Sequence, residues 1–109
     1  MNEACRLFSA LPFVRKYDRP KNVIEGDSFQ TECYAWGYPQ VTVVWHNGSR
    51  ALVADAEKVS LRNGSAENST LRVNDVLDED TGDYTCVVTN PLGSVNTTVS
   101  LRVKGEVSL

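Results

Sequence analysis

The chain has 109 residues, of which 41% are hydrophobic and 23% charged, with a net charge of −3. These values fit one ordinary globular domain. The 11 basic residues form no run or stripe, which argues against a nucleic-acid or heparin partner, and no apolar stretch approaches the ~20 residues that cross a bilayer. A membrane anchor of the parent protein would therefore lie outside this chain.

The two ends of the chain carry little pattern. A short apolar run from Leu7 is interrupted by Pro12, and neither the basic start nor the cleavage pattern of a secretory signal is present. We predict a flexible N-terminal tail or linker at 1–10, a folded domain at 11–104 and a C-terminal tail at 105–109. A secretory signal is the less favoured alternative for the first segment, and Cys5 is interpreted as a stray thiol there.

Apolar residues alternate with polar ones along the folded part, and Gly, Asn, Asp and Pro punctuate them at short intervals. This pattern is typical of a β-sandwich or barrel. Residues 12–16 predict a short edge strand that Pro20 ends, and residues 21–24 resume on the other sheet. The remaining predicted inward-facing alternations are 29–33, 41–45, 59–61, 71–73, 84–88 and 95–103.

Two turns have recognisable chemistry. Asn47-Gly48 predicts a two-residue type I′ hairpin turn, because both positions tolerate positive φ. Residues 77–83 form an acidic corner that lacks the ligand order of a calcium loop. We therefore expect no metal there, and we expect Asp80 to pair with Lys58 or Arg62 at a gain of under ~1 kcal/mol.

Several motifs together resemble the immunoglobulin superfamily. Residues 80–86, Asp-Thr-Gly-Asp-Tyr-Thr-Cys, resemble its Asp-x-Gly-x-Tyr-x-Cys signature. Residues 33–39 followed by Trp45 are similar to the I-set subclass, as are residues 25–27 before Phe29 and the pair at 12–13. The resemblance covers about residues 11–104.

A finer resemblance is to the basigin and neuroplastin group, at residues 37–39, at 89–90 with 93–94, and at 101–103. Growth-factor-receptor ectodomains and neural adhesion proteins share similar fragments. Val41 stands where many I-set domains carry a second proline. The subgroup therefore stays open.

The family resemblance implies an all-β fold, an immunoglobulin-like (I-set) two-sheet antiparallel Greek-key sandwich. It implies a disulfide between Cys33 and Cys86, with Trp45 buried against it and Tyr84 forming a tyrosine corner. Closing such a long loop is worth roughly 4 kcal/mol in the chain-entropy model. Cys5 is left unpaired.

Four sequons permit N-glycosylation in a secreted protein, at Asn47, Asn63, Asn68 and Asn96. Asn47 and Asn63 precede glycine, so an alternative is that they serve only as turn residues. Four sequons in so short a chain favour the use of at least two. Together with the implied disulfide they predict an extracellular or cell-surface location.

Two surfaces are candidates for partner binding. The first is the outer face of the sheet that carries the strands of Trp45 and Cys86, where Val44 and Val87 should point outward; an alternative is that they are ordinary exposed valines. Residues expected beside them are Thr85, Thr89, Thr98 and, at the rim, His46. The second is the loop end that would expose Trp36, Tyr38 and Leu92, unless Tyr38 only caps the core.

A glycan and a partner would compete for the first surface: either Asn96 is glycosylated and contact shifts to Trp36, Tyr38 and Leu92, or Asn96 is bare and the sheet face is free to associate. Asn96 is out of phase with its inward-facing neighbours, so it should project from the same face as Val44 and Val87. A glycan on Asn96 would obstruct a flat contact there.

An enzyme is not expected, because His46 is the single histidine and no catalytic or metal-binding cluster is available. No cofactor, nucleic acid or small-molecule substrate is expected. We predict an extracellular recognition or adhesion module that binds a protein partner, homophilic or heterophilic. The alternative is a structural spacer in a multi-domain ectodomain or a muscle-type filament protein, and a reduced, unglycosylated chain would favour the filament.

Overall fold

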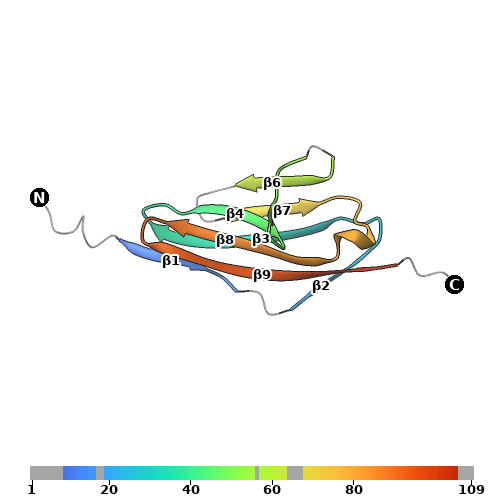
Figure 1. Ribbon diagram of the computed structural model, residues 1–109, viewed down its shortest axis with the longest axis horizontal. Helices are drawn as coiled ribbons and strands as arrows, with labels where there is room; N and C mark the ends of the chain where they lie inside the picture. The colour runs from blue at the N-terminus through green and yellow to red at the C-terminus, as the bar shows by residue number, and fades with distance from the viewer. Residues whose placement is uncertain (1–8, 17–18, 56, 64–67, 106–109) are drawn as a thin grey trace, which may run out of the picture.

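The computed structural model describes residues 9–16, 19–55, 57–63 and 68–105, with the Asn63 side chain left out. Two β-sheets pack face to face (Figure 1). The first contains, in order, β1 (Ala10–Val14), β3 (Phe29–Tyr38), β7 (Asn68–Val73) and β6 (Val59–Asn63). The second contains β2 (Lys21–Ile24), β9 (Gly93–Lys104), β8 (Gly82–Asn90), β4 (Thr42–Asn47) and β5 (Arg50–Ala51).

A 3-10 turn, η2 (Asp78–Asp80), precedes β8. The all-β sandwich predicted from the sequence is confirmed. Within the described part of the chain, no helix is long and apolar enough to span a membrane. The expected tails at 1–10 and 105–109, with Cys5, lie almost wholly outside the described residues.

The first strand region divides between the two sheets, as the position of Pro20 predicts. β1 pairs antiparallel with β3, whereas β2 pairs with β9 in the other sheet. The β2–β9 pairing is parallel, which departs from a wholly antiparallel sandwich. Because the chain crosses from one sheet to the other between β1 and β2, β2 reaches β9 without a hairpin and is free to run beside it in the same direction.

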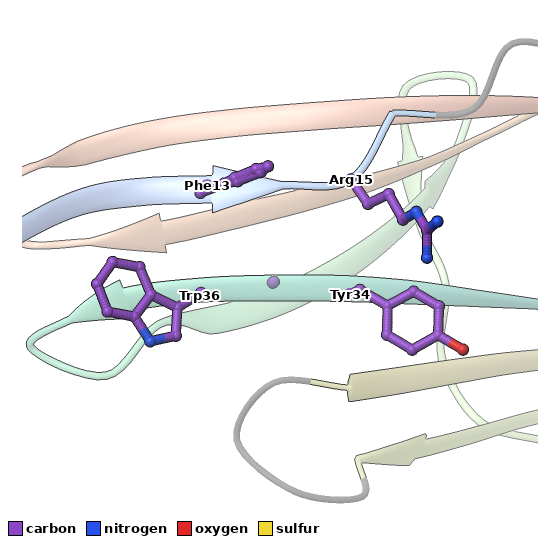
Figure 2. Close-up of a pocket in the computed structure, with 5 residues that line it drawn as sticks. Phe13, Arg15, Tyr34 and Trp36 are labelled. Atoms are coloured by element: carbon purple, nitrogen blue, oxygen red, sulfur yellow. The ribbon is translucent and has the colours of Figure 1, made fainter.

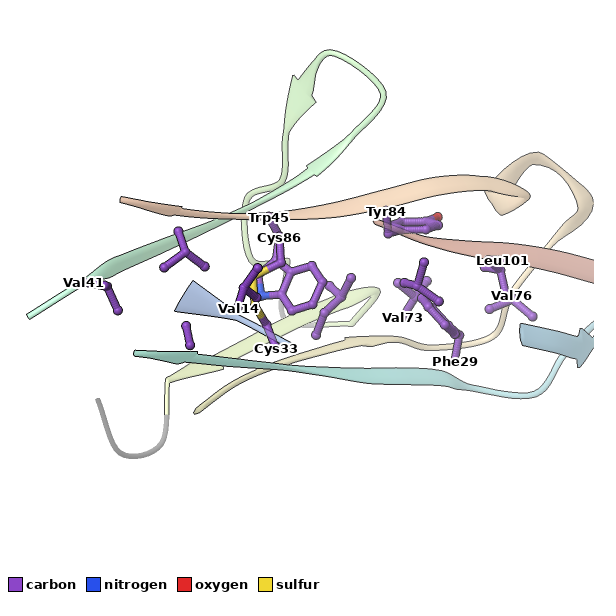
Figure 3. Close-up of a cluster of buried hydrophobic side chains, with 14 residues drawn as sticks. Val14, Phe29, Cys33, Val41, Trp45, Val73, Val76, Tyr84, Cys86 and Leu101 are labelled. Atoms are coloured by element: carbon purple, nitrogen blue, oxygen red, sulfur yellow. A yellow bond between two sulfur atoms is a disulfide. The ribbon is translucent and has the colours of Figure 1, made fainter. Parts of the chain in front are cut away.

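A disulfide between Cys33 and Cys86 joins the two sheets through β3 and β8, with the two Cα atoms 6.4 Å apart. Trp45 is only 3% exposed and lies beside this bridge (Figure 3). Its indole Nε1 donates a hydrogen bond of 3.0 Å to the hydroxyl of Ser69, which is itself buried. The N–H that burial would otherwise leave unsatisfied therefore has a partner across the sandwich.

Tyr84 packs at the other end of the core, 2% exposed, with its ring centroid 5.4 Å from that of Phe29. Its hydroxyl donates a 2.7 Å hydrogen bond to the backbone oxygen of Asp80, which is the geometry of a tyrosine corner. Burial, followed by the negative charge of Asp80, raises the pKa of Tyr84 to about 12. Both effects oppose formation of a phenolate inside the fold.

Of the two cations expected to pair with Asp80, the structure selects Lys58. Its Nζ lies 2.7 Å from an Asp80 carboxylate oxygen and also donates to the backbone oxygen of Asp75 at 3.0 Å. The same Asp80 oxygen accepts from the backbone N–H of Leu77 at 2.8 Å. Asp80 therefore holds the acidic corner together.

The hairpin between β4 and β5 corrects the prediction of an Asn47-Gly48 turn. Asn47 still belongs to β4 and pairs with Arg50, so the two loop residues are Gly48 and Ser49. Gly48 has a φ of 62°, and Ser49 is not among the described residues with positive φ. Glycine alone at the first loop position fits a type II′ turn, whereas type I′ needs positive φ at both. The register is therefore shifted by one residue.

Replacing Trp45 with alanine should lower the free energy of unfolding by about 3–5 kcal/mol, because it empties the space beside the disulfide. Urea denaturation followed by circular dichroism measures the loss. Trp36→Ala is the matched control: Trp36 is half exposed, so its loss should stay under about 1 kcal/mol. Equal losses in the two variants would contradict a core role for Trp45.

Alkaline pH should destabilise the domain through Tyr84. Between pH 10 and 12 the unfolded chain has released the phenolic proton while the folded chain retains it, so the free energy of unfolding falls as pH rises through this window. The fall attributable to Tyr84 is about 2–3 kcal/mol. Comparing urea midpoints of the wild type and Tyr84→Phe across this range measures it.

Tyr84→Phe should be less stable at neutral pH by about 1 kcal/mol and should lose this part of the alkaline slope. Tyr38→Phe, at an exposed tyrosine, is the control and should keep the wild-type slope. An unchanged slope in Tyr84→Phe would refute the assignment.

Candidate functional site: two outer sheet faces

The outer face of the first sheet carries a group of exposed aromatic side chains. Trp36 on β3 is 53% exposed and stands opposite Phe13 of β1, which is 54% exposed. Tyr34, 44% exposed, follows on the same face of β3. We name Phe13, Tyr34 and Trp36, together with Arg15, the aromatic surface (Figure 2).

The aromatic surface has a defined shape. Its four residues and Ala35 line a hollow of about 370 Å³. The Arg15 guanidinium carbon lies 5.9 Å from the centroid of the Tyr34 ring, within range of a cation–π contact. The backbone N–H of Arg15 donates to the backbone oxygen of Tyr34 at 3.0 Å, which extends the pairing of β1 with β3. The rings are therefore presented on paired strands, not on a loop.

The placement of Trp36 and Tyr38 differs from the expected loop end. β3 continues through Tyr38, so both side chains extend from a strand, and Trp36 belongs to the sheet face. Tyr38 is 53% exposed, which disfavours a core-capping role. Leu92 does lie in the β8–β9 turn, as expected, and is also exposed.

The side chain of Asn90 fixes this end of the sandwich. Its Nδ2 donates to the backbone oxygens of Ala10 and Pro39, each at 3.0 Å, and its Oδ1 accepts from the N–H of Leu92 at 2.9 Å. The β8–β9 turn is thus tied to β1 and to the turn after β3. Leu92 therefore lies at the end of the sandwich where β3 ends, and Trp36 lies on the outer sheet face opposite Phe13.

The sequence-based choice of candidates missed Phe13, Tyr34 and Arg15. For Tyr34 a signal was available, because it adjoins the inward-facing Cys33 and must therefore point outward. For Phe13 and Arg15 no comparable signal existed. Their position depends on the register of β1 against β3, which is irregular between Ala10 and Phe13.

The outer face of the second sheet is arranged as its alternation predicts. Val44, Val87 and Asn96 stand in one row across β4, β8 and β9. Val44 and Asn96 are exposed, and Val87 is half-buried. The flanking rows contain hydroxyl pairs, Thr85 with Thr98 at 2.9 Å and Thr89 with Ser94 at 3.1 Å, and His46 at the rim is half-buried.

The four sequons differ in how the fold presents them. Asn96 is exposed and projects outward from β9. Asn47 is half-buried, and its Oδ1 lies 3.5 Å from where a Cβ on Gly82 would stand. Asn68 is half-buried and donates from Nδ2 to Glu32 at 3.4 Å, while the side chain of Asn63 lies outside the described residues.

The fold and the Cys–Trp–Cys core match those of a known protein family. The family described as Immunoglobulin I-set domain matches residues 12–103. The chain belongs to this family. Immunoglobulin-like domains are binding and structural modules, not enzymes, and they generally mediate contacts between proteins.

Similar proteins fall into different functional settings. The muscle M-line assembly protein unc-89 of Caenorhabditis elegans is 36% identical over 77% of the chain, and the netrin receptor DCC of Rattus norvegicus is 37% identical over 78%. A chain in the titin M10–obscurin-like 1 complex is 26% identical, with a TM-score of 0.81 over 91% of this chain and 99% of its own length. The chain spans only 1% of unc-89 and 6% of the netrin receptor.

Of the three sequons whose side chains are described, we expect Asn96 to be the most fully glycosylated and Asn47 the least, because the folded domain must leave room for the glycan at the side-chain nitrogen. Expression through a mammalian secretory pathway followed by glycopeptide mass spectrometry measures each occupancy. Asn96→Gln should reduce the number of glycans in the intact protein by one, and Asn47→Gln should leave that number unchanged. Full occupancy at Asn47 with a bare Asn96 would contradict this ranking.

Proposed function

We propose that this I-set domain is an extracellular recognition or adhesion module that acts by binding another protein. The observation that carries the proposal is the aromatic surface on the outer face of the first sheet. Aromatic residues and arginine are the side chains most enriched in the centres of protein interfaces. Here three rings and an arginine gather around one hollow and are held by strand pairing.

The rigidity of this surface favours binding. Phe13 and Trp36 extend from strands whose backbones are already hydrogen-bonded, so little backbone entropy remains to be lost when a partner docks. Burying these rings against a partner would also be favourable, because both are about half exposed in the free domain and their apolar surface would leave water. A spacer domain has no requirement for such a group of exposed rings.

Two further features support an extracellular setting. The buried Cys33–Cys86 bridge forms and persists in oxidising compartments. The sequon at Asn96 is presented on an exposed strand position, as an acceptor in a secreted protein must be. Within the family, residues 37–39, 89–90 with 93–94, and 101–103 remain the basis for proposing a place near the basigin and neuroplastin group.

A structural spacer is the second candidate, and the similarity to the M-line assembly protein and to a titin complex favours it. The two functions differ in redox state and modification. A spacer in a muscle filament would be reduced and unglycosylated, whereas a recognition module would carry the bridge and at least one glycan. Mass spectrometry of the parent protein from its native source decides between them.

Binding itself is tested with the domain secreted from mammalian cells, tetramerised on fluorescent streptavidin, and applied to a panel of cell types. Trp36→Ala should reduce cell binding by more than about fivefold, because an interface anchor is worth over 1 kcal/mol. Val53→Ala, at an exposed residue away from the aromatic surface, is the matched control and should bind like the wild type. Equal binding by wild type and Trp36→Ala would reject the aromatic surface as the site.

A further inference from the structure

The outer face of the first sheet is basic, although the chain as a whole has a net charge of −3. Arg15 belongs to the aromatic surface, and Arg62 and Arg72 line a second hollow on the neighbouring strands. Among the described side chains of this face, the one acid is Glu32. Strand pairing places these arginines on one face of the sheet, Arg15 just after β1, Arg62 on β6 and Arg72 on β7.

Among the described residues, the single carboxylate of this face, Glu32, offsets only part of its positive charge. Glu32 already accepts from the Tyr34 hydroxyl at 3.3 Å and from Asn68 at 3.4 Å. Arg72 donates to the neutral side chains of Asn74 at 2.9 Å and Gln30 at 3.1 Å. Over the described residues, the ion pair that forms is Lys58 with Asp80, away from this face. A partner with negative charge would therefore meet arginines that have no carboxylate partner among the described residues.

The acidic corner before β8 has the complementary character. Leu77 is 41% exposed there, next to the exposed carboxylates of Asp78 and Glu79. Asp80 is engaged by Lys58, and Asp83 accepts from the Ser100 hydroxyl at 2.7 Å. The corner thus presents one apolar side chain followed by two exposed acids, which is complementary to an aromatic hollow lined by one arginine.

The corner and the aromatic surface lie toward opposite ends of the sandwich (Figure 1). The corner is tied to the turn that begins β3, through the Gly26 N–H and the Val76 oxygen at 2.9 Å. Trp36 is near the end of β3, about 23 Å further along at 3.3 Å per residue. One copy cannot bring its own corner onto its own aromatic surface.

We propose that the aromatic surface binds the acidic corner of a second copy of this chain, with Leu77 entering the hollow and Asp78 and Glu79 facing Arg15. This inference rests on the proposed function and names a homophilic partner for it. A symmetric pairing of two such faces is disfavoured, because it would bring arginines against arginines. A corner-to-face contact avoids this repulsion.

The contact is heterologous, since each copy offers its corner at one end and its face at the other. A single corner-to-face contact leaves one corner and one face of the pair unoccupied, so association continues into an open chain or, where the rotation between copies closes, a ring. Sedimentation velocity should show a weight-average coefficient that rises steadily with concentration, without a plateau at the dimer. Raising the salt from 50 to 500 mM should weaken the association by at least about fivefold, because the charges are exposed.

Two variants separate the halves of the contact. The face variant, Arg15→Ala with Trp36→Ala, removes the hollow, and the corner variant, Asp78→Asn with Glu79→Gln, removes the free acids while sparing Asp80. Each variant alone should sediment as a monomer at every concentration. Mixed in equal amounts, they should form a 1:1 dimer and stop there, since each retains the half that the other has lost. Val53→Ala is the control and should associate like the wild type.

Three outcomes would overturn the proposal: a wild type that stays monomeric at millimolar concentration, association that ends at a dimer, or a variant mixture that stays monomeric. Thermal unfolding of each variant verifies that it is folded. The cell-binding experiment is independent of these results. A monomeric domain that still binds cells through Trp36 would reject the homophilic partner and leave the proposed function intact.

Discussion

The disulfide between Cys33 and Cys86 is the constraint on which the rest of the structure depends, because it fixes which face of two central strands points inward. Once Cys33 faces the core, the even-numbered residues of β3 must face solvent. Tyr34 and Trp36 are therefore exposed for the same reason that Cys33 is buried. The aromatic surface follows from the core and is not an addition to it.

The two outer faces of the sandwich are chemically unlike, and this difference divides their roles. The second sheet presents hydroxyl groups and two valines beside Asn96, a surface that a glycan can occupy without leaving charges unsolvated. The first sheet presents rings and arginines. A sugar on β9 would obstruct one face and leave the other open, so modification and recognition need not compete.

Much of the fold could be predicted from the sequence, because strand phase depends only on alternation around Cys33, Trp45 and Cys86. The resemblance of residues 80–86 to the family signature predicted the two-sheet sandwich, and the family match confirms it. The sheet change at Pro20 was also predictable. The hairpin register was not, since Asn47-Gly48 and Gly48-Ser49 are both acceptable turns and the choice depends on cross-strand pairing. Only the part of the aromatic surface on β3 was predictable from the sequence. The register that sets Phe13 beside Trp36 is a long-range property that no local pattern encodes.

The parallel pairing of β2 with β9 has a mechanical consequence. Four residue pairs, from Lys21 with Leu101 to Ile24 with Lys104, join a strand near the start of the chain to one near its end. Tension between the two ends pulls these strands in opposite directions along their length. Every bond of the ladder is then loaded together in shear instead of opening one after another. The sandwich is thereby built to resist stretching along its long axis.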